Sequence, residues 1–152
     1  MNLDETADQL QARTRMAVAL QRLGHALVGH RVDLVLTDRI TVAADELTEA
    51  VVSGPARDRA AEMAANPRFA ALLDGAPRET VGMDGEPMEL FRDSIVSGRT
   101  NPMGIGLEVR RDGDAVVATT VLGPAFEGAP GRAHGGVVAA ILDETMGYVL
   151  PI

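Results

Sequence analysis

The chain has 152 residues, the length of one ordinary domain, and 46% of them are hydrophobic, so it can bury a core. Its net charge of -8 argues against nonspecific nucleic-acid binding, and its aromatic content of 3% leaves no platform for stacking bases. The absence of cysteine excludes disulfides, thiolate metal sites and cysteine nucleophiles. The acidic N-terminus does not resemble a secretory signal, and no apolar run reaches membrane-spanning length. We therefore expect a cytoplasmic protein with neither a membrane nor a nucleic-acid partner.

The first part of the chain, residues 1–73, is rich in Ala, Leu, Arg, Asp and Glu and predicts a helical N-terminal region. Apolar residues recur at near-helical spacing over 3–29, which predicts a first long helix. Two more helices are predicted over 41–52 and 57–65, each followed by a Pro-containing stop. The pattern over 33–40 fits a short strand or a connection equally well.

Glycine and proline are frequent from residue 74, and we predict a linker over 74–100 that contains one short strand around 90–96. After this linker the hydrophobic spacing changes to period two. Residues 105–110 and 115–121 predict two strands, and the Asp-Gly pair between them is typical of a β-hairpin turn. The turn-rich segment 126–133 then leads into the last predicted helix.

A helix predicted over 136–148 contains the most informative residues. At about 100° per residue, Gly136, Ala140, Asp143 and Gly147 share one stripe, which is small except for a single carboxylate. Most of the remaining surface is apolar or small, so we predict a largely buried helix. Because an unpaired buried charge is costly, the carboxylate suggests a function. The alternative is that Asp143 is exposed or is paired with another helix.

The tripeptide His134-Gly135-Gly136 stands at the start of this helix. Two glycines leave backbone N–H groups bare at the positive helix end, which suits a carbonyl oxygen that gains negative charge during acyl transfer. A carboxylate at Asp143, two turns further along, can act on the reacting carbon directly or through water. We therefore expect both groups to converge on one reacting carbonyl group, with Asp143 in a groove rather than in bulk solvent. His134 alone is weak evidence, because a lone histidine is more often structural.

A metal site is not expected in this chain. Besides His134, its only histidines are His25 and His30, which are five residues apart and share no helix face well. We predict neither a metal nor another cofactor.

The His-Gly-Gly motif is followed by an Asp nine positions after the His and is preceded by Gly-x-Pro-Gly. The wider pattern runs from Asn101-Pro102-Met103-Gly104 through Asp112-Gly113-Asp114 to Phe126 and on to Glu144. This stretch, about the last third of the chain, resembles the PaaI-like branch of the hotdog-fold acyl-CoA thioesterases. The N-terminal helical part resembles no family that we can name.

The resemblance implies an α+β hotdog fold, in which a curved antiparallel sheet wraps a long helix. It also implies a homodimer or homotetramer that binds the acyl-CoA thioester at the dimer interface. Asp143 would be the general base or nucleophile, the Gly135 N–H would belong to the oxyanion hole, and His134 would flank it. Three more residues are expected to contact the substrate: Gly136, Asn101 and Ala140.

Two departures from the family pattern affect these expectations. Many relatives have an Asn six residues before the His, where this chain has Gly128. A hotdog domain also continues with several strands after its helix, so we expect 101–152 to be the first part of an incomplete domain that is inactive alone. The other interpretation is that the N-terminal half covers the helix instead.

Two functions compete with thioester hydrolysis. The departures leave open a non-catalytic acyl-CoA-binding protein, and residues 3–73 leave open a helical protein-interaction module. A hotdog hydratase is less favoured, because the sequence lacks the different Asp/His pairing that those enzymes use.

Overall fold

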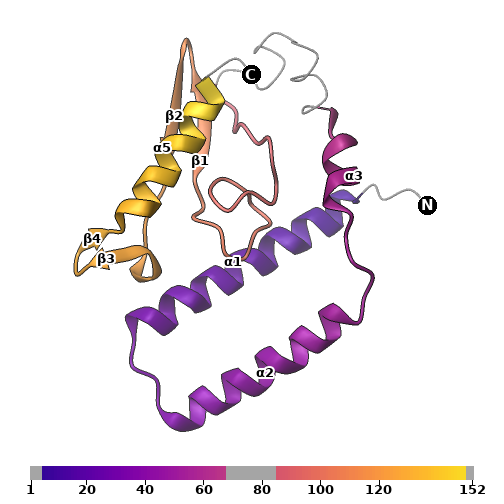
Figure 1. The fold of residues 1–152 in the computed structure, drawn as a ribbon, viewed down its shortest axis with the longest axis vertical. Coiled ribbons are helices and arrows are strands. Elements are labelled where there is room, and N and C mark those ends of the chain that lie inside the picture. Colours follow the sequence, from indigo (N-terminus) through magenta and orange to yellow (C-terminus); the bar gives the residue numbers. More distant parts are fainter. Residues whose placement is uncertain (1–4, 68–84, 150–152) are drawn as a thin grey trace.

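The computed structural model describes residues 5–67 and 85–149, whose arrangement Figure 1 shows. The fold is α+β, as predicted. Its elements are α1 (Ala7–Gly29), α2 (Leu34–Val52), α3 (Arg59–Ala64), β1 (Glu108–Asp112), β2 (Ala115–Thr119), the 3-10 helix η2 (Pro124–Phe126), β3 (Glu127–Ala129), β4 (Arg132–Ala133) and α5 (Gly135–Val149). Helix α5 lies along the β1–β2 hairpin, while α1 and α2 form two long arms beside this unit. Within the described ranges, no helix has both the length and the apolar character that crossing a membrane requires.

Side-chain caps explain where the N-terminal helices begin. The Thr6 and Gln9 side chains form a reciprocal capping box at the start of α1. The Asp33 carboxylate accepts a hydrogen bond of 2.8 Å from the Leu36 N–H, so α2 begins at Leu34. The helix predicted to begin at residue 41 therefore begins seven residues earlier. Both alternatives for 33–40, a strand and a connection, are wrong. The other two predicted helices are confirmed within a few residues.

The predicted β-hairpin is confirmed. Strands β1 and β2 pair antiparallel from Glu108 opposite Thr119 to Asp112 opposite Ala115. Gly113 has a φ of 58°, the left-handed conformation that the tight turn needs and that glycine adopts at little cost. The turn-rich segment before α5 forms a second small antiparallel pair, β3 and β4.

The short strand predicted around 90–96 is wrong, because these residues form a series of turns. The Ser94 hydroxyl accepts hydrogen bonds from the N–H groups of Val96, at 3.1 Å, and Ser97, at 3.3 Å, which bends the chain. A Cβ at Gly98 would lie 2.4 Å from the Ser94 nitrogen, so this fold-back requires glycine. Residues 74–84 of the predicted linker, and its boundary with the helical region at residue 73, lie outside the described residues.

The hydrophobic core lies between the segment after residue 85, the β1–β2 hairpin and one face of α5. Its buried residues are Met88, Leu90, Val96, Ile105, Leu107, Val109 and Tyr148. Helix α5 adds the partly buried Val137, Ala140 and Ile141. The core therefore fixes which face of α5 points inward.

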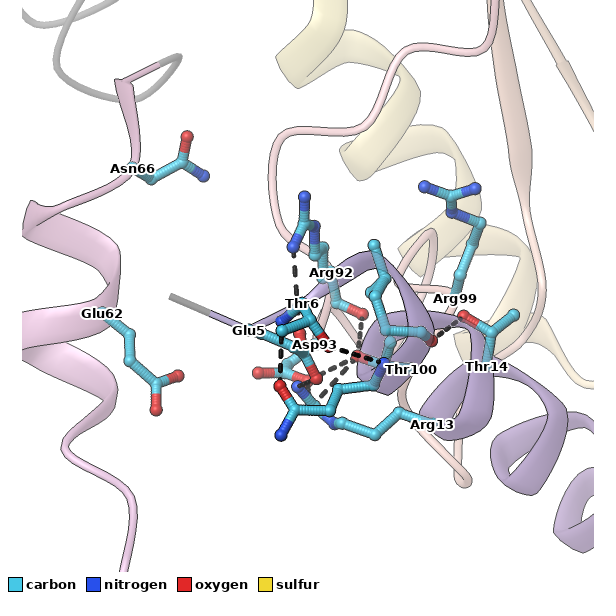
Figure 2. A network of polar contacts seen from close by, with 12 residues as sticks. Glu5, Thr6, Arg13, Thr14, Glu62, Asn66, Arg92, Asp93, Arg99 and Thr100 are labelled. Carbon is cyan, nitrogen blue, oxygen red and sulfur yellow. Dashed lines mark hydrogen bonds and ion pairs between the residues drawn. The ribbon is translucent and has the colours of Figure 1, made fainter. Parts of the chain in front are cut away.

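An ion-pair network around Asp93 connects α1 and the segment before α3 to this core unit, and Figure 2 shows Arg13 and Thr100 beside that carboxylate. Arg13 of α1 and Arg57, just before α3, each donate to Asp93 at 2.8 Å, and Thr100 donates at 2.7 Å. Burial would raise the pKa of Asp93, but the hydrogen bonds from Arg57 and Thr100 outweigh it and hold the pKa below its ordinary value. Asp93 is thus stabilised in its charged form.

We expect Asp93→Asn to lower the free energy of unfolding by about 1.5 kcal/mol at neutral pH. Because the folded-state pKa of Asp93 is lowered, its contribution is present above the unfolded pKa of about 3.9 and is lost as pH falls through the folded pKa. Urea unfolding at pH 7 and in acid should show the difference between variant and wild type disappearing in acid. Asp114→Asn, at an exposed turn residue, makes the same charge change as a control. An equal deficit at both pH values would contradict this role.

Candidate functional site

The start of α5 is built around His134. The His134 N–H donates to the Phe126 carbonyl at 2.8 Å, and the His134 carbonyl accepts from the Val137 N–H at 2.9 Å. The Nδ1 atom of the ring accepts from the Gly136 N–H at 3.0 Å, which places the ring proton on Nε2. His134 is therefore the cap of the helix, so its predicted position beside the glycine amides is supported by a specific contact.

The two glycines after His134 have different roles. The Gly136 N–H is occupied by the His134 ring, and a Cβ at Gly136 would lie 3.1 Å from that ring nitrogen. A side chain at position 136 would therefore crowd the His134 ring. The Gly136 amide is also not free to bind a substrate, because it donates to that ring. Across 5–67 and 85–149, no group accepts a hydrogen bond from the Gly135 N–H, and a Cβ there would meet nothing within 4 Å. One bare amide thus remains at the positive end of α5.

Gly128, where the thioesterase pattern has an asparagine, lies close to the same cap. A Cβ at Gly128 would be 3.0 Å from the His134 Cα. An asparagine side chain does not fit there without moving the loop. This chain therefore has no asparagine amide at position 128 that could donate a hydrogen bond to an oxyanion.

Asp143 lies on the exposed face of α5. The core covers the face that carries Val137, Ile141 and Tyr148, so the prediction of a largely buried helix is wrong for the single chain. Ala140, which shares the stripe of Asp143, lies at the edge of this face and is partly buried. The expected groove around Asp143 is likewise not formed by the described part of one chain. Instead, Asp143 is flanked by Leu142 and Met146, whose exposed fractions are 58% and 55%.

The helix also separates the two predicted chemical groups. Gly135 and Asp143 are eight residues apart in α5, which is about 12 Å along the axis at the rise of an α-helix. The oxygen that would accept a hydrogen bond from the Gly135 amide and the carbon on which the Asp143 carboxylate would act belong to one carbonyl group. These two atoms are only ~1.2 Å apart. One α5 helix therefore cannot place both groups directly on the same thioester, and the expectation of convergence within one helix does not hold.

Asn101 occupies a loop that packs on α1. Its side-chain amide donates to the Asp93 carbonyl at 3.0 Å, and its side-chain oxygen accepts from the Met103 N–H at 2.8 Å. Its own carbonyl accepts from Gln21 of α1 at 2.9 Å. Among the described residues, these hydrogen bonds order the loop and none reaches α5, so the structure does not bring Asn101 to the other predicted site residues.

A buried polar cluster on the inner face of α5 was not predicted. Ser94 donates to the Glu144 carboxylate at 2.8 Å, and Ser97 donates to the same oxygen. The Tyr148 hydroxyl lies 3.2 Å from the Ser97 hydroxyl and accepts from the Leu90 N–H at 3.2 Å. Since the Ser97 proton goes to Glu144, Tyr148 donates to Ser97, and the chain of donors ends on the carboxylate. The cluster connects α5 firmly to the 90–97 segment.

The sequence contains only part of the signal for this cluster. Glu144 and Tyr148 stand four apart on one helix face, and two serines stand three apart near residue 95. The contacts themselves are long-range, because Ser94 and Ser97 lie 50 and 47 residues before Glu144 in the sequence. Glu144 positions the helix that carries its neighbour Asp143, whereas no side chain in the described part of the chain holds Asp143 in this way.

Burial raises the pKa of the Tyr148 hydroxyl, and the charge of Glu144 raises it further. Tyr148 is the sole tyrosine and the chain has no tryptophan, so ultraviolet absorbance titrates this group alone. We expect a native pKa above the ordinary value of about 10, which is restored in denaturant. The stability that neutral Tyr148 adds is present below that value and is lost as pH rises through the folded pKa. Glu144→Gln should reverse only part of the shift, and equal native and denatured midpoints would contradict the cluster.

Other possible sites lie away from α5. A hollow of about 320 Å³ is lined by Gly85, Arg110, Arg111, Asp112 and Val117 at the β1–β2 hairpin, and it includes none of the predicted site residues. Among the described residues, no three His, Asp or Glu side chains gather in a way that could hold a metal ion. Comparison with protein-family models, curated proteins and solved structures finds no match to this chain.

Proposed function

We propose that this protein is a hotdog-type acyl-CoA thioesterase whose catalytic groups are the Gly135 amide and the Asp143 carboxylate. The observation that supports this most is the start of α5, where the His134 ring occupies the Gly136 amide and the Gly135 amide has no partner among the described residues. An oriented N–H at a positive helix end suits the developing oxyanion of acyl transfer. The sequence resemblance supplies the substrate class.

The active form in this proposal is a pair of chains whose exposed α5 faces meet antiparallel. The reason is the separation of about 12 Å between Gly135 and Asp143 on one helix. An antiparallel pair that crosses at Ala139, midway between them, places the Gly135 amide of one copy near the Asp143 carboxylate of the other. Such a two-fold interface is self-complementary and creates two equal sites. The exposed Leu142 and Met146 would supply its apolar contacts.

The reaction follows from this arrangement. The thioester carbonyl accepts a hydrogen bond from the Gly135 N–H, which stabilises the negative charge that forms on its oxygen. Asp143 of the other copy removes a proton from a water molecule as the water oxygen bonds to the carbonyl carbon. The carbon–sulfur bond then breaks, CoA leaves as a thiolate, and the free acid forms. Nucleophilic attack by Asp143, followed by hydrolysis of the anhydride, gives the same products.

The first test is turnover by the wild-type protein. A thiol reagent detects released CoA without background, because the chain has no cysteine. The assay uses the 152-residue chain and, in parallel, the product of the longest open reading frame that contains it, with aryl, short-chain and medium-chain acyl-CoA. Release of CoA at a rate that saturates with substrate supports the proposal. Failure of both proteins to release CoA would refute it.

The second candidate function is acyl-CoA binding without catalysis. It is favoured by Gly128, whose approach to His134 leaves no room for the amide side chain that relatives have there. Binding measured by calorimetry separates the two functions. Saturable binding without release of CoA supports the binding protein, whereas release of CoA excludes it.

A further inference from the structure

Helix α2 is left uncovered by the described part of the chain. None of its residues is buried, and Leu47 and Val51 expose 65% and 76% of their surface. Eight of its 19 residues are β-branched, namely Val35, Thr37, Ile40, Thr41, Val42, Thr48, Val51 and Val52. Such residues have modest helix propensity, and most helical stability in proteins comes from packing rather than from propensity. A surface outside the described part of this chain is therefore expected to pack on α2.

The uncovered surfaces of α1 and α2 have matching spacing. On α2 an apolar stripe with alternating steps of four and three residues consists of Leu36, Ile40, Ala43, Leu47 and Ala50. On α1 a second stripe with the same steps consists of Met16, Leu20, Leu23 and Leu27, with exposed fractions from 48% to 39%. This is the spacing of helices that pack knobs into holes along a shared seam. Both arms thus carry a seam, and neither seam is covered in the single chain.

The opposite face of α1 is already occupied by the core unit. Ala17 is fully buried there, and Gln21 donates to the Asn101 carbonyl at 2.9 Å. His25 accepts from the Ala125 N–H at 3.2 Å and packs edge-on against Phe126. The stripe on α1 is therefore a second, separate surface, and α2 runs as the other arm of the hairpin without covering it (Figure 1).

The two arms have opposite charge. Helix α1 has a net charge of +2, from Arg13, Arg15 and Arg22 against Asp8. Helix α2 has a net charge of −3, from Asp38, Asp45, Glu46 and Glu49 against Arg39. Two α2 helices would repel each other, whereas α1 and α2 attract. Arg13 is already paired with Asp93, so Arg15 and Arg22 are the cations that α1 offers to an acidic α2.

We propose that the partner of this surface is a second copy of the chain, with α1 of each copy packed on α2 of the other in a four-helix bundle. A second copy fits because one chain presents both a basic helix and an acidic helix, each with an exposed apolar stripe. A two-fold pairing then covers all four stripes at once. This contact is separate from the α5 pairing and does not depend on any catalytic activity.

The mass of the full chain in solution tests this contact. Light scattering over a dilution series compares wild type with Leu47→Glu, which places a charge in the α2 seam. Val121→Glu is the matched control, because Val121 is 91% exposed and lies outside both arms. We expect Leu47→Glu to raise the apparent dissociation constant at least about tenfold and the control to leave it unchanged. A wild-type protein that is monomeric at every concentration, or an unchanged constant in Leu47→Glu, overturns the proposal.

Cross-linking identifies which helices meet. Because the chain has no cysteine, copies with Leu20→Cys can be mixed with copies with Ala43→Cys and treated with a short bis-maleimide. We expect mixed dimers that join α1 of one copy to α2 of the other. A chain that carries both substitutions tests the alternative. If this double variant cross-links only within one chain, and the mixture yields no dimer, the two arms close on each other and the proposal fails.

Discussion

Asp143→Asn is expected to lower the rate of acyl-CoA hydrolysis by at least ~10²-fold, because the amide can neither accept a proton from water nor attack the thioester. The side chain is exposed and makes no hydrogen bond within residues 5–67 and 85–149, so the change should leave the fold intact. Released thiol measures the rate, and thermal unfolding of the same samples checks the fold. The loss should appear in kcat as well as in kcat/KM, since the role proposed for the carboxylate lies in the chemical step.

The matched control is Asp114→Asn, which removes the same charge at the exposed β1–β2 turn. It should keep the wild-type rate, so a general effect of net charge on binding anionic CoA is separated from chemistry. A wild-type rate in Asp143→Asn would show that the carboxylate takes no part. The likeness to the thioesterase motif would then be coincidental for this residue.

The sequence predicted those parts of the fold that depend on neighbours along the chain. Periodicity located α1 and α5, and the Asp-Gly pair located the turn of the β1–β2 hairpin, since these features depend on interactions within a few residues. The start of α2 was missed because its first turns contain β-branched residues that also suit a strand, whereas the Asp33 cap outweighed that preference.

Features that depend on distant contacts were not predictable. The apolar run at 90–96 resembles a strand, yet Ser94 and Ser97 bend it toward Glu144 of α5. Likewise, α5 is apolar on most of its surface, so its pattern cannot say which face the core covers. The core covers the face of Ile141 and Tyr148 and leaves Asp143 outside, which is why the predicted site is incomplete in one chain.

Gly135→Pro is expected to lower kcat by about 10²–10³-fold, the usual cost of removing one oxyanion-hole donor. Proline has no N–H, but it is well tolerated at the first position of a helix, where Gly135 stands. The substitution therefore removes the proposed donor and keeps α5. Gly135→Ala keeps the N–H and adds a methyl group into open space, so it should retain most of the activity. Equal losses in the two variants would indicate a structural effect rather than a lost donor.

Mixing Asp143→Asn with Gly135→Pro tests whether each site draws on two copies. Each variant alone has no intact site. In a mixed dimer, the Gly135 amide of the first variant meets the Asp143 carboxylate of the second, so one of the two sites is restored. Random mixing should then recover about one quarter of the wild-type rate, because about half of the dimers are mixed and each has one working site. If both groups acted from the same helix, no mixture would recover activity, since neither chain has both groups.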